Sequence, residues 1–198
     1  MTRLTSVSLA CLMLCFALSG CALWSSEDPQ GTPLSERRSA SADVSPEAGQ
    51  LFSKAHVLWK GTDVCSDPAQ AVHDLDQAIA LEPDYADAYM YRGLAYSEMG
   101  QDDLSFDDLT QSIRLDPKPH RYAYRALALM RQDNMPGARR DLDTSLKMDS
   151  SQYRAWNFRG ALNMLEENVQ AACEDFAQGC KNGDCGGLNA AKKEGLCN

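Results

Sequence analysis

The feature that most constrains this chain is a sequence pattern that returns about every 34 residues from residue 46 onward. Each copy has the apolar spacing of two helices, and each helix pair would leave an apolar face that only the next pair can cover. Small residues recur where the two helices approach closely, and aromatic residues recur where a gap needs filling. The aromatic position holds Tyr89, Tyr122 and Trp156, and the small positions include Gly93, Ser105, Ala138, Gly160 and Ala172.

This pattern resembles the tetratricopeptide repeat (TPR), whose signature positions in the second copy are filled by Tyr89, Gly93, Tyr96, Ser105, Leu109 and Pro117. The resemblance implies an all-α fold, a right-handed TPR helical solenoid of about four helix-turn-helix units. Their expected boundaries are 46–83, 84–117, 118–150 and 151–180. The third unit has Ala126 in place of glycine and Ser150 in place of the closing proline, so we expect its helices to pack or end differently.

Charged residues recur in the same register. An arginine lies on the first helix of three units and an aspartate follows on the second helix, which predicts a repeating ladder of ion pairs. A charged-ligand site is the alternative, although a ligand would not contact every unit in the same way. The ladder would comprise Arg92, Arg125 and Arg159 with Asp108, Asp141 and Asp175, and Asp74 holds the equivalent position in the first unit.

The N-terminus has the layout of an export signal over residues 1–20. Arg3 precedes an apolar stretch, 7–18, that is short for a bilayer span. Leu18-Ser19-Gly20-Cys21 then resembles the lipobox of bacterial lipoproteins, which implies cleavage before Cys21 and acylation of that cysteine with chains such as palmitate. An ordinary signal peptide that contains cysteine is the alternative. Ala22 implies sorting to the outer membrane, and 21–45 would form the lipidated cysteine and a disordered tether that leaves the folded part in the periplasm.

Five cysteines remain beyond Cys21, and four of them lie in the last 26 residues. An exported protein favours disulfides, and the absence of a CxxC pair disfavours zinc. Cys173 and Cys180 lie too far apart along one helix to pair, which leaves Cys173–Cys185 with Cys180–Cys197, or Cys173–Cys197 with Cys180–Cys185. This ending resembles that of many exported bacterial TPR proteins, which implies that 181–198 forms a stapled cap with a short helix at about 186–195. We expect Cys65 to be a buried thiol, and the alternative is a covalent partner site.

The resemblance also implies a groove lined by the first helices, where a protein or peptide of the cell envelope would bind. Methionines and aromatic residues at matching heights suit a helical or extended peptide. Coverage by a capping helix or by self-association is the alternative. The expected groove residues are Met90, Tyr91, Leu94 and Ser97 in the second unit, Tyr124, Leu127, Met130 and Arg131 in the third, and Arg154, Asn157, Phe158 and Met164 in the fourth.

The net charge argues against a nucleic-acid-binding protein, and the absence of catalytic motifs argues against an enzyme. The net charge of −9 argues against nucleic acid, and no catalytic motif or converging catalytic group is present, so we expect no enzyme and no cofactor beyond the lipid on Cys21. Residues 62–116 carry 13 acids and two bases, whereas 117–160 carry nine bases and four acids. The sequence therefore predicts a membrane-tethered interaction adaptor. The chain resembles TPR lipoproteins that assist type IV pilus assembly or bring peptidoglycan hydrolases to their regulators. The alternatives are a self-assembling envelope lipoprotein and, less favoured, a thiol-disulfide exchange protein.

Overall fold

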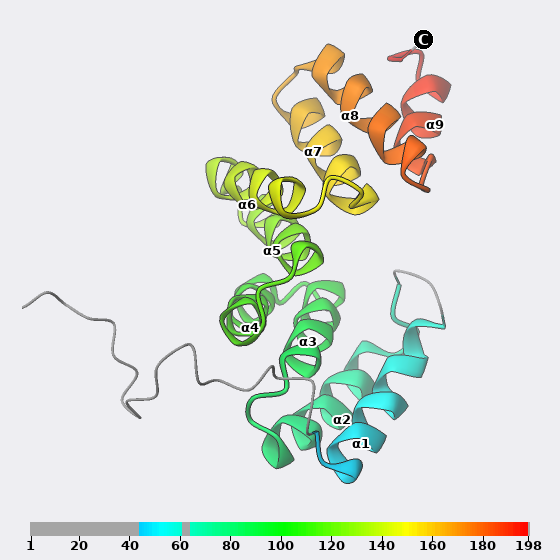
Figure 1. Cartoon of the computed structure of the whole chain (residues 1–198). Helices are drawn as coiled ribbons and strands as arrows, with labels where there is room; N and C mark the ends of the chain where they lie inside the picture. Colours follow the sequence, from blue (N-terminus) through cyan, green and yellow to red (C-terminus); the bar gives the residue numbers. More distant parts are fainter. Residues whose placement is uncertain (1–43, 61–63, 198) are drawn as a thin grey trace, which may run out of the picture. The chain divides into compact units, whose positions relative to one another are not determined.

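In the computed structural model, which describes residues 44–60 and 64–197, helices are the only regular elements of these described ranges (Figure 1). The expected signal peptide of residues 1–20, Cys21 and the expected tether as far as residue 43 lie outside the described residues. The elements are α1 (Pro46–His56), the 3₁₀ turn η1 (Val57–Trp59), α2 (Pro68–Leu81), α3 (Ala86–Glu98), α4 (Asp102–Leu115), α5 (Pro119–Arg131), α6 (Met135–Met148), α7 (Tyr153–Leu165), α8 (Val169–Lys181) and α9 (Gly186–Lys193).

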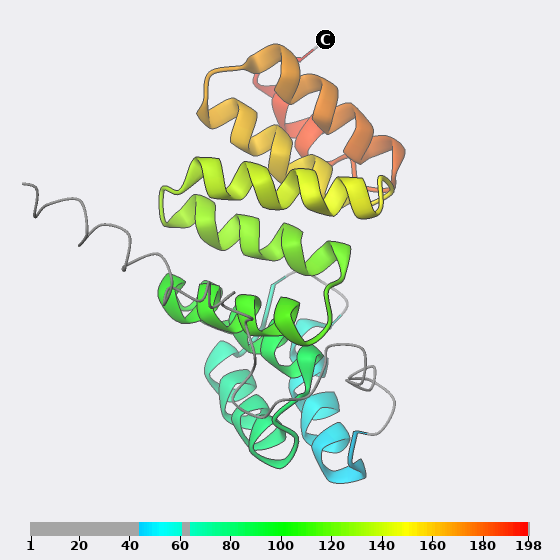
Figure 2. The same cartoon turned by 60° about the vertical axis from the view of Figure 1, so that its left-hand side comes forward.

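The helices form antiparallel pairs that stack in chain order, as Figure 2 shows for α1/α2 through α7/α8. We call the earlier helix of each pair its first helix and the later one its second helix. Extensive contacts join α5 to α7, and α3 also touches α5, whereas no comparable contact joins successive second helices within the described ranges. The first helices therefore lie on the inner side of the stack. The predicted all-α TPR fold is confirmed.

Local sequence sets the helix ends. Ser45, Asp67, Asn134 and Asn168 accept hydrogen bonds from backbone N–H groups in the first turns of α1, α2, α6 and α8. The second helices α2, α4 and α6 all end immediately before an acidic residue, at Glu82, Asp116 and Asp149. The expectation that the third unit ends differently without its proline was wrong, because α6 stops at the equivalent position.

A short cap closes the C-terminal end. Helix α9 packs on α8 and also touches α7, so it takes the place that the first helix of a further unit would hold. The Phe176 ring of α8 lies close to two glycines: a Cβ added to Gly160 of α7 or Gly187 of α9 would come within 2.6 Å or 2.5 Å of the ring. Absence of a side chain at these two positions therefore allows α7 and α9 to approach α8 closely.

Two disulfides fasten this cap to α8. Cys173 pairs with Cys197, with 5.6 Å between their Cα atoms, and Cys180 pairs with Cys185. The structure thus adopts one of the two pairings that the sequence left open. Helix α9 ends at Lys193, two residues before the expected end. Among the described helices, none combines the length and apolar character needed to traverse a bilayer.

Candidate partner-binding surface

The ladder of ion pairs holds each first helix against its second helix. Arg92 donates from Nε and Nη2 to the two carboxylate oxygens of Asp108, both at 2.7 Å. Arg125 contacts Asp141 in the same two-point manner at 2.7 and 2.9 Å, and Arg159 contacts Asp175 at 3.0 and 2.8 Å. Each pair spans sixteen residues, so the predicted register is confirmed. In the first unit Lys54 takes the arginine's role and contacts Asp74 at 2.8 Å.

In two units the third nitrogen of the ladder arginine reaches an aspartate of the preceding unit. Nη1 of Arg92 donates to Asp76 at 2.6 Å, and Nη1 of Arg159 donates to Asp143 at 3.0 Å. Hydrogen bonding to Asp108 is the main cause that raises the pKa of Arg92, so the guanidinium stays charged. The ladder therefore joins neighbouring units as well as the helices within one unit.

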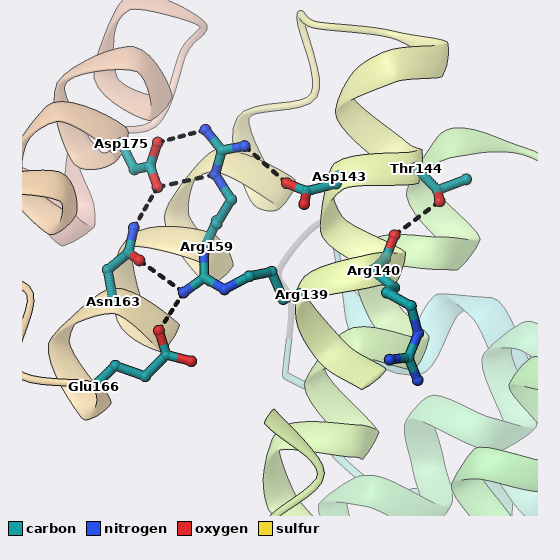
Figure 3. A network of polar contacts seen from close by, with 8 residues as sticks. All are labelled: Arg139, Arg140, Asp143, Thr144, Arg159, Asn163, Glu166 and Asp175. Atoms are coloured by element: carbon teal, nitrogen blue, oxygen red, sulfur yellow. Dashed lines mark hydrogen bonds and ion pairs between the residues drawn. The ribbon is translucent and has the colours of Figure 1, made fainter. Parts of the chain in front are cut away.

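Aromatic rings and an unexpected amide complete the ladder. The Arg92 guanidinium lies 5.4 Å from the ring centre of Tyr89, and Arg159 lies 4.7 Å from that of Trp156. In Figure 3, Asn163 links Arg159's partner Asp175 to Arg139 of α6, which also contacts Glu166. Polar contacts therefore run continuously between the third and fourth units.

In the second unit, the predicted groove residues are largely used inside the fold. Met90 is buried at 5% exposure in a cluster with Leu109 and Ala128, so its assignment to the groove was wrong. The Tyr91 ring lies edge-on to Trp59 at 4.9 Å, and its hydroxyl is 2.8 Å from Nε2 of His56. Leu94 and Ser97 remain half-buried.

In the third unit, the inner side of α5 keeps accessible apolar surface. Leu127 is half-buried and packs against none of the hydrophobic clusters found among the described residues. Met130 is also half-buried, although it rests on the core of this unit. The Tyr124 ring packs on the Met90 cluster, and Arg131 is exposed but forms an ion pair with Asp102 at 2.5 Å.

In the fourth unit, the cap and the core cover part of the predicted groove. Asn157 donates to the Asp184 carboxylate at 2.7 Å, in the segment that leads into α9, and Met164 packs on the cluster that contains Cys197. These two positions are corrections, because the cap occupies them. Phe158 packs on the core of the third and fourth units. The Arg154 guanidinium lies 4.6 Å from the Tyr153 ring centre and 5.8 Å from that of Tyr124.

The surface that remains on the inner side is narrower than the sequence predicted. We define the inner surface as five half-buried or exposed side chains of the first helices α3 and α5, namely Leu94, Ser97, Leu127, Met130 and Arg131. It combines apolar side chains with one cationic side chain, which suits contact with a peptide more than chemistry on a small molecule. No group of three or more His, Cys, Asp or Glu residues within the described ranges could hold a metal ion.

Two further features bear on reactivity. Burial is the main cause that raises the pKa of the Cys65 thiol, and the residue is 5% exposed. Both observations agree with a buried thiol and oppose a reactive one. The sequence analysis also missed Arg121, a fully buried charged residue between the second and third units. Its signal was a spacing of 33 residues between Tyr89 and Tyr122, one less than between Tyr122 and Trp156.

Comparisons with known proteins place these helix pairs among the tetratricopeptide repeats. One family model, "TPR repeat", matches residues 69–100, and another, "Tetratricopeptide repeat", matches 125–184. Human "Tetratricopeptide repeat protein 13" is 25% identical over 122 residues, which is 62% of this chain. The match spans only 14% of the length of that human protein.

Solved structures share the fold at low sequence identity. A thermophilic TPR protein of Thermus thermophilus, TTC0263, has a TM-score of 0.63 at 14% identity, covering 76% of this chain and 81% of its own. MamA has a TM-score of 0.57 at 17% identity, covering 68% and 77%. YrrB, described as a TPR protein with an unusual peptide-binding site, has a TM-score of 0.55 at 17% identity, covering 69% of each chain. Because the family matches fall on the helix pairs that the structure stacks, these pairs are tetratricopeptide repeats and the described part of the chain has the TPR fold.

Proposed function

We propose that this protein is a non-catalytic adaptor that binds a protein or peptide of the cell envelope on its inner surface. In this proposal a lipid on Cys21 tethers it to the bacterial outer membrane, with the repeats in the periplasm and no cofactor other than the lipid. The TPR fold supports an interaction scaffold, and YrrB offers a case in which such a fold carries a peptide-binding site. The resemblance of residues 1–20 to an export signal, and of Leu18-Ser19-Gly20-Cys21 to a lipobox, supports the proposed location.

The observation that carries the binding role is the partial exposure of Leu127, which packs against none of the hydrophobic clusters of the described residues. This side chain is half-exposed on a first helix, although apolar residues of the same unit such as Leu142 are fully buried. Leu94 of α3 and Met130 of α5 are also half-buried, although both pack against hydrophobic clusters of the core. In this proposal the three partly accessible side chains supply the apolar part of an interface with another chain.

Self-assembly through attraction between the acidic segment 62–116 of one copy and the basic segment 117–160 of another is less well supported. Arg121 and Arg131 of the basic half pair with Asp87 and Asp102 of the acidic half, across the junction of the second and third units. Part of the opposite charge is therefore used within one molecule.

The test is site-specific photo-crosslinking of the full chain in its native host. One probe replaces Leu127 on the inner surface, and a matched control probe replaces Arg140 of α6. The Arg140 side chain is exposed, and in Figure 3 it points away from the contacts between Arg139 and Asn163. A second inner probe at Leu94 shows whether the partner spans both units. Fractionation of the host and mass spectrometry of Cys21 test the anchor independently.

We expect an envelope protein to be captured from Leu127 and Leu94 and not from Arg140. Capture of the same protein from all three positions, or of this chain alone, would contradict the adaptor role. An unmodified Cys21 would contradict the lipid tether while leaving the binding result intact, so the two parts of the proposal can fail separately.

A further inference from the structure

The junction between the second and third helix pairs is built differently from its neighbours. The linker between α4 and α5 comprises residues 116–118, whereas the equivalent linkers comprise 82–85 and 149–152. The chain is therefore one residue shorter at this junction. The first turn of α5 must start closer to the end of α4, which changes what its side chains meet.

Arg121 occupies the position in this turn that alanine holds in both adjoining units. It directly precedes Tyr122, as Ala88 precedes Tyr89 and Ala155 precedes Trp156, and all three preceding residues have 0% exposure. A charge in such a place destabilises the fold unless partners compensate it. The second and third helix pairs therefore stay packed together at this junction only if the partners of Arg121 compensate its charge.

These partners come from two other parts of the chain. Nη2 of Arg121 donates to the Asp87 carboxylate of α3 at 2.5 Å, and Nη1 donates to the Asp116 carboxylate at 2.7 Å and to the Asp116 carbonyl. Nε of Arg121 is buried without a hydrogen-bond partner among the described residues. One cation with an incomplete set of hydrogen bonds thus links α3, the linker and α5.

His120 directly precedes Arg121 in the first turn of α5, is half-buried, and interacts electrostatically with Arg121, Asp87 and Asp116. Burial is the main cause that lowers the pKa of His120, and repulsion from Arg121 and Lys118 acts in the same direction. Attraction from Asp87 and Asp116 opposes the shift without reversing it. The closed junction therefore favours the neutral ring.

We propose that the junction between the second and third helix pairs is an acid-sensitive joint, which loosens when His120 gains a proton beside the buried Arg121 cluster. A histidine with a lowered folded-state pKa gives full stability above its unfolded value of about 6.5 and loses it as the pH falls from there toward the folded value. Opening would move α3 relative to α5, the two helices that carry the inner surface. The inference concerns the joint itself and does not require the adaptor role.

Hydrogen exchange of the full chain in detergent tests the joint at about pH 7.5 and about pH 5.5, either side of the ordinary histidine value. After correction for the intrinsic effect of pH, we expect severalfold faster exchange at the lower pH in the first turns of α3 and α5. The segments α7 and α8 should change little. His120→Gln should abolish the increase, whereas the control His73→Gln, at an exposed histidine of α2, should retain it.

An equal acid response in His120→Gln, a response spread evenly over all helix pairs, or no response at all would overturn the proposal. NMR titration of the His120 ring in the unmodified protein gives a second readout that needs no substitution. A titration midpoint below pH ~6.5 would support the acid-sensitive joint, and a midpoint at or above that pH would contradict the proposal.

Discussion

At the scale of single residues, the ladder shows how a repeated sequence position becomes a repeated contact. Arginine and aspartate sixteen residues apart meet in every unit that has both, because each hairpin places them at the same height. The aromatic residue three positions before each arginine packs on its guanidinium. Recurrence in register is therefore the reason that these contacts could be predicted without a structure.

Replacing Asp141 by Asn should destabilise the protein by about 1–3 kcal/mol, because the charged partner of Arg125 is lost in a largely buried place. For a chain of this size the melting temperature should fall by roughly 2–4 °C for each kcal/mol. Circular dichroism during heating gives the measurement. The control Asp107→Asn, at an exposed residue of α4, should stay within about 0.5 kcal/mol of the parent, and equal stability of the two variants would contradict a stabilising ladder.

Predictions for single groove residues were less successful for a physical reason. Their positions on the first helices followed from the repeat, but whether a side chain is accessible depends on what the rest of the chain packs against it. Met90 is covered within its own repeats, while Asn157 is covered by the segment before α9. Arg121 was missed because it departs from the repeat, and a pattern carries no information about the residue that breaks it.

At the scale of helices, glycine determines how closely α7 and α9 approach α8. Gly160→Ala would force a methyl group to within 2.6 Å of the Phe176 ring, which also lies close to Gly187 of α9. We expect a loss of about 1–3 kcal/mol from overpacking. The control Gly49→Ala lies in α1 with open space around its added methyl, and it should stabilise the protein by about 0.5–1 kcal/mol through helix propensity. Chemical denaturation measures both, and a loss in the control equal to that of Gly160→Ala would contradict the close-packing argument.

The disulfides act at the same scale, since both join the capping segment to α8. Removing Cys173 and Cys197 together by alanine substitution should cost about 3 kcal/mol, because the bond closes a separation of 24 residues. Removing Cys180 and Cys185, only five residues apart, should cost less. Denaturation under non-reducing conditions ranks the two variants. Peptide mapping of the unreduced protein checks the pairing directly, and a peptide linking Cys173 to Cys185 would contradict it.

At the scale of the whole described stack, the covered C-terminal end and the ion pairs between the acidic and basic halves favour a single-copy solenoid. Solenoids that extend by stacking present an apolar face at their ends. Here α9 packs on α8 and α7 and so covers that face at the C-terminal end. The sequence predicted the cap through resemblance, but only the structure shows that α9 takes the place of a further first helix.

The last prediction follows from that closure and from the ion pairs that cross between the acidic and basic halves. Sedimentation velocity of the full chain in detergent should show one species whose size does not change with protein concentration at low salt. High salt should leave it unchanged, because Arg121, the partner of Asp87, is buried, and such a pair is screened less than exposed pairs are. A larger species at low salt that dissociates at high salt would show that exposed charges join copies, and would restore the self-assembling alternative. Asp87 and Asp102 form ion pairs with arginines of the same molecule, so their charge is already compensated and contributes little to attraction between copies.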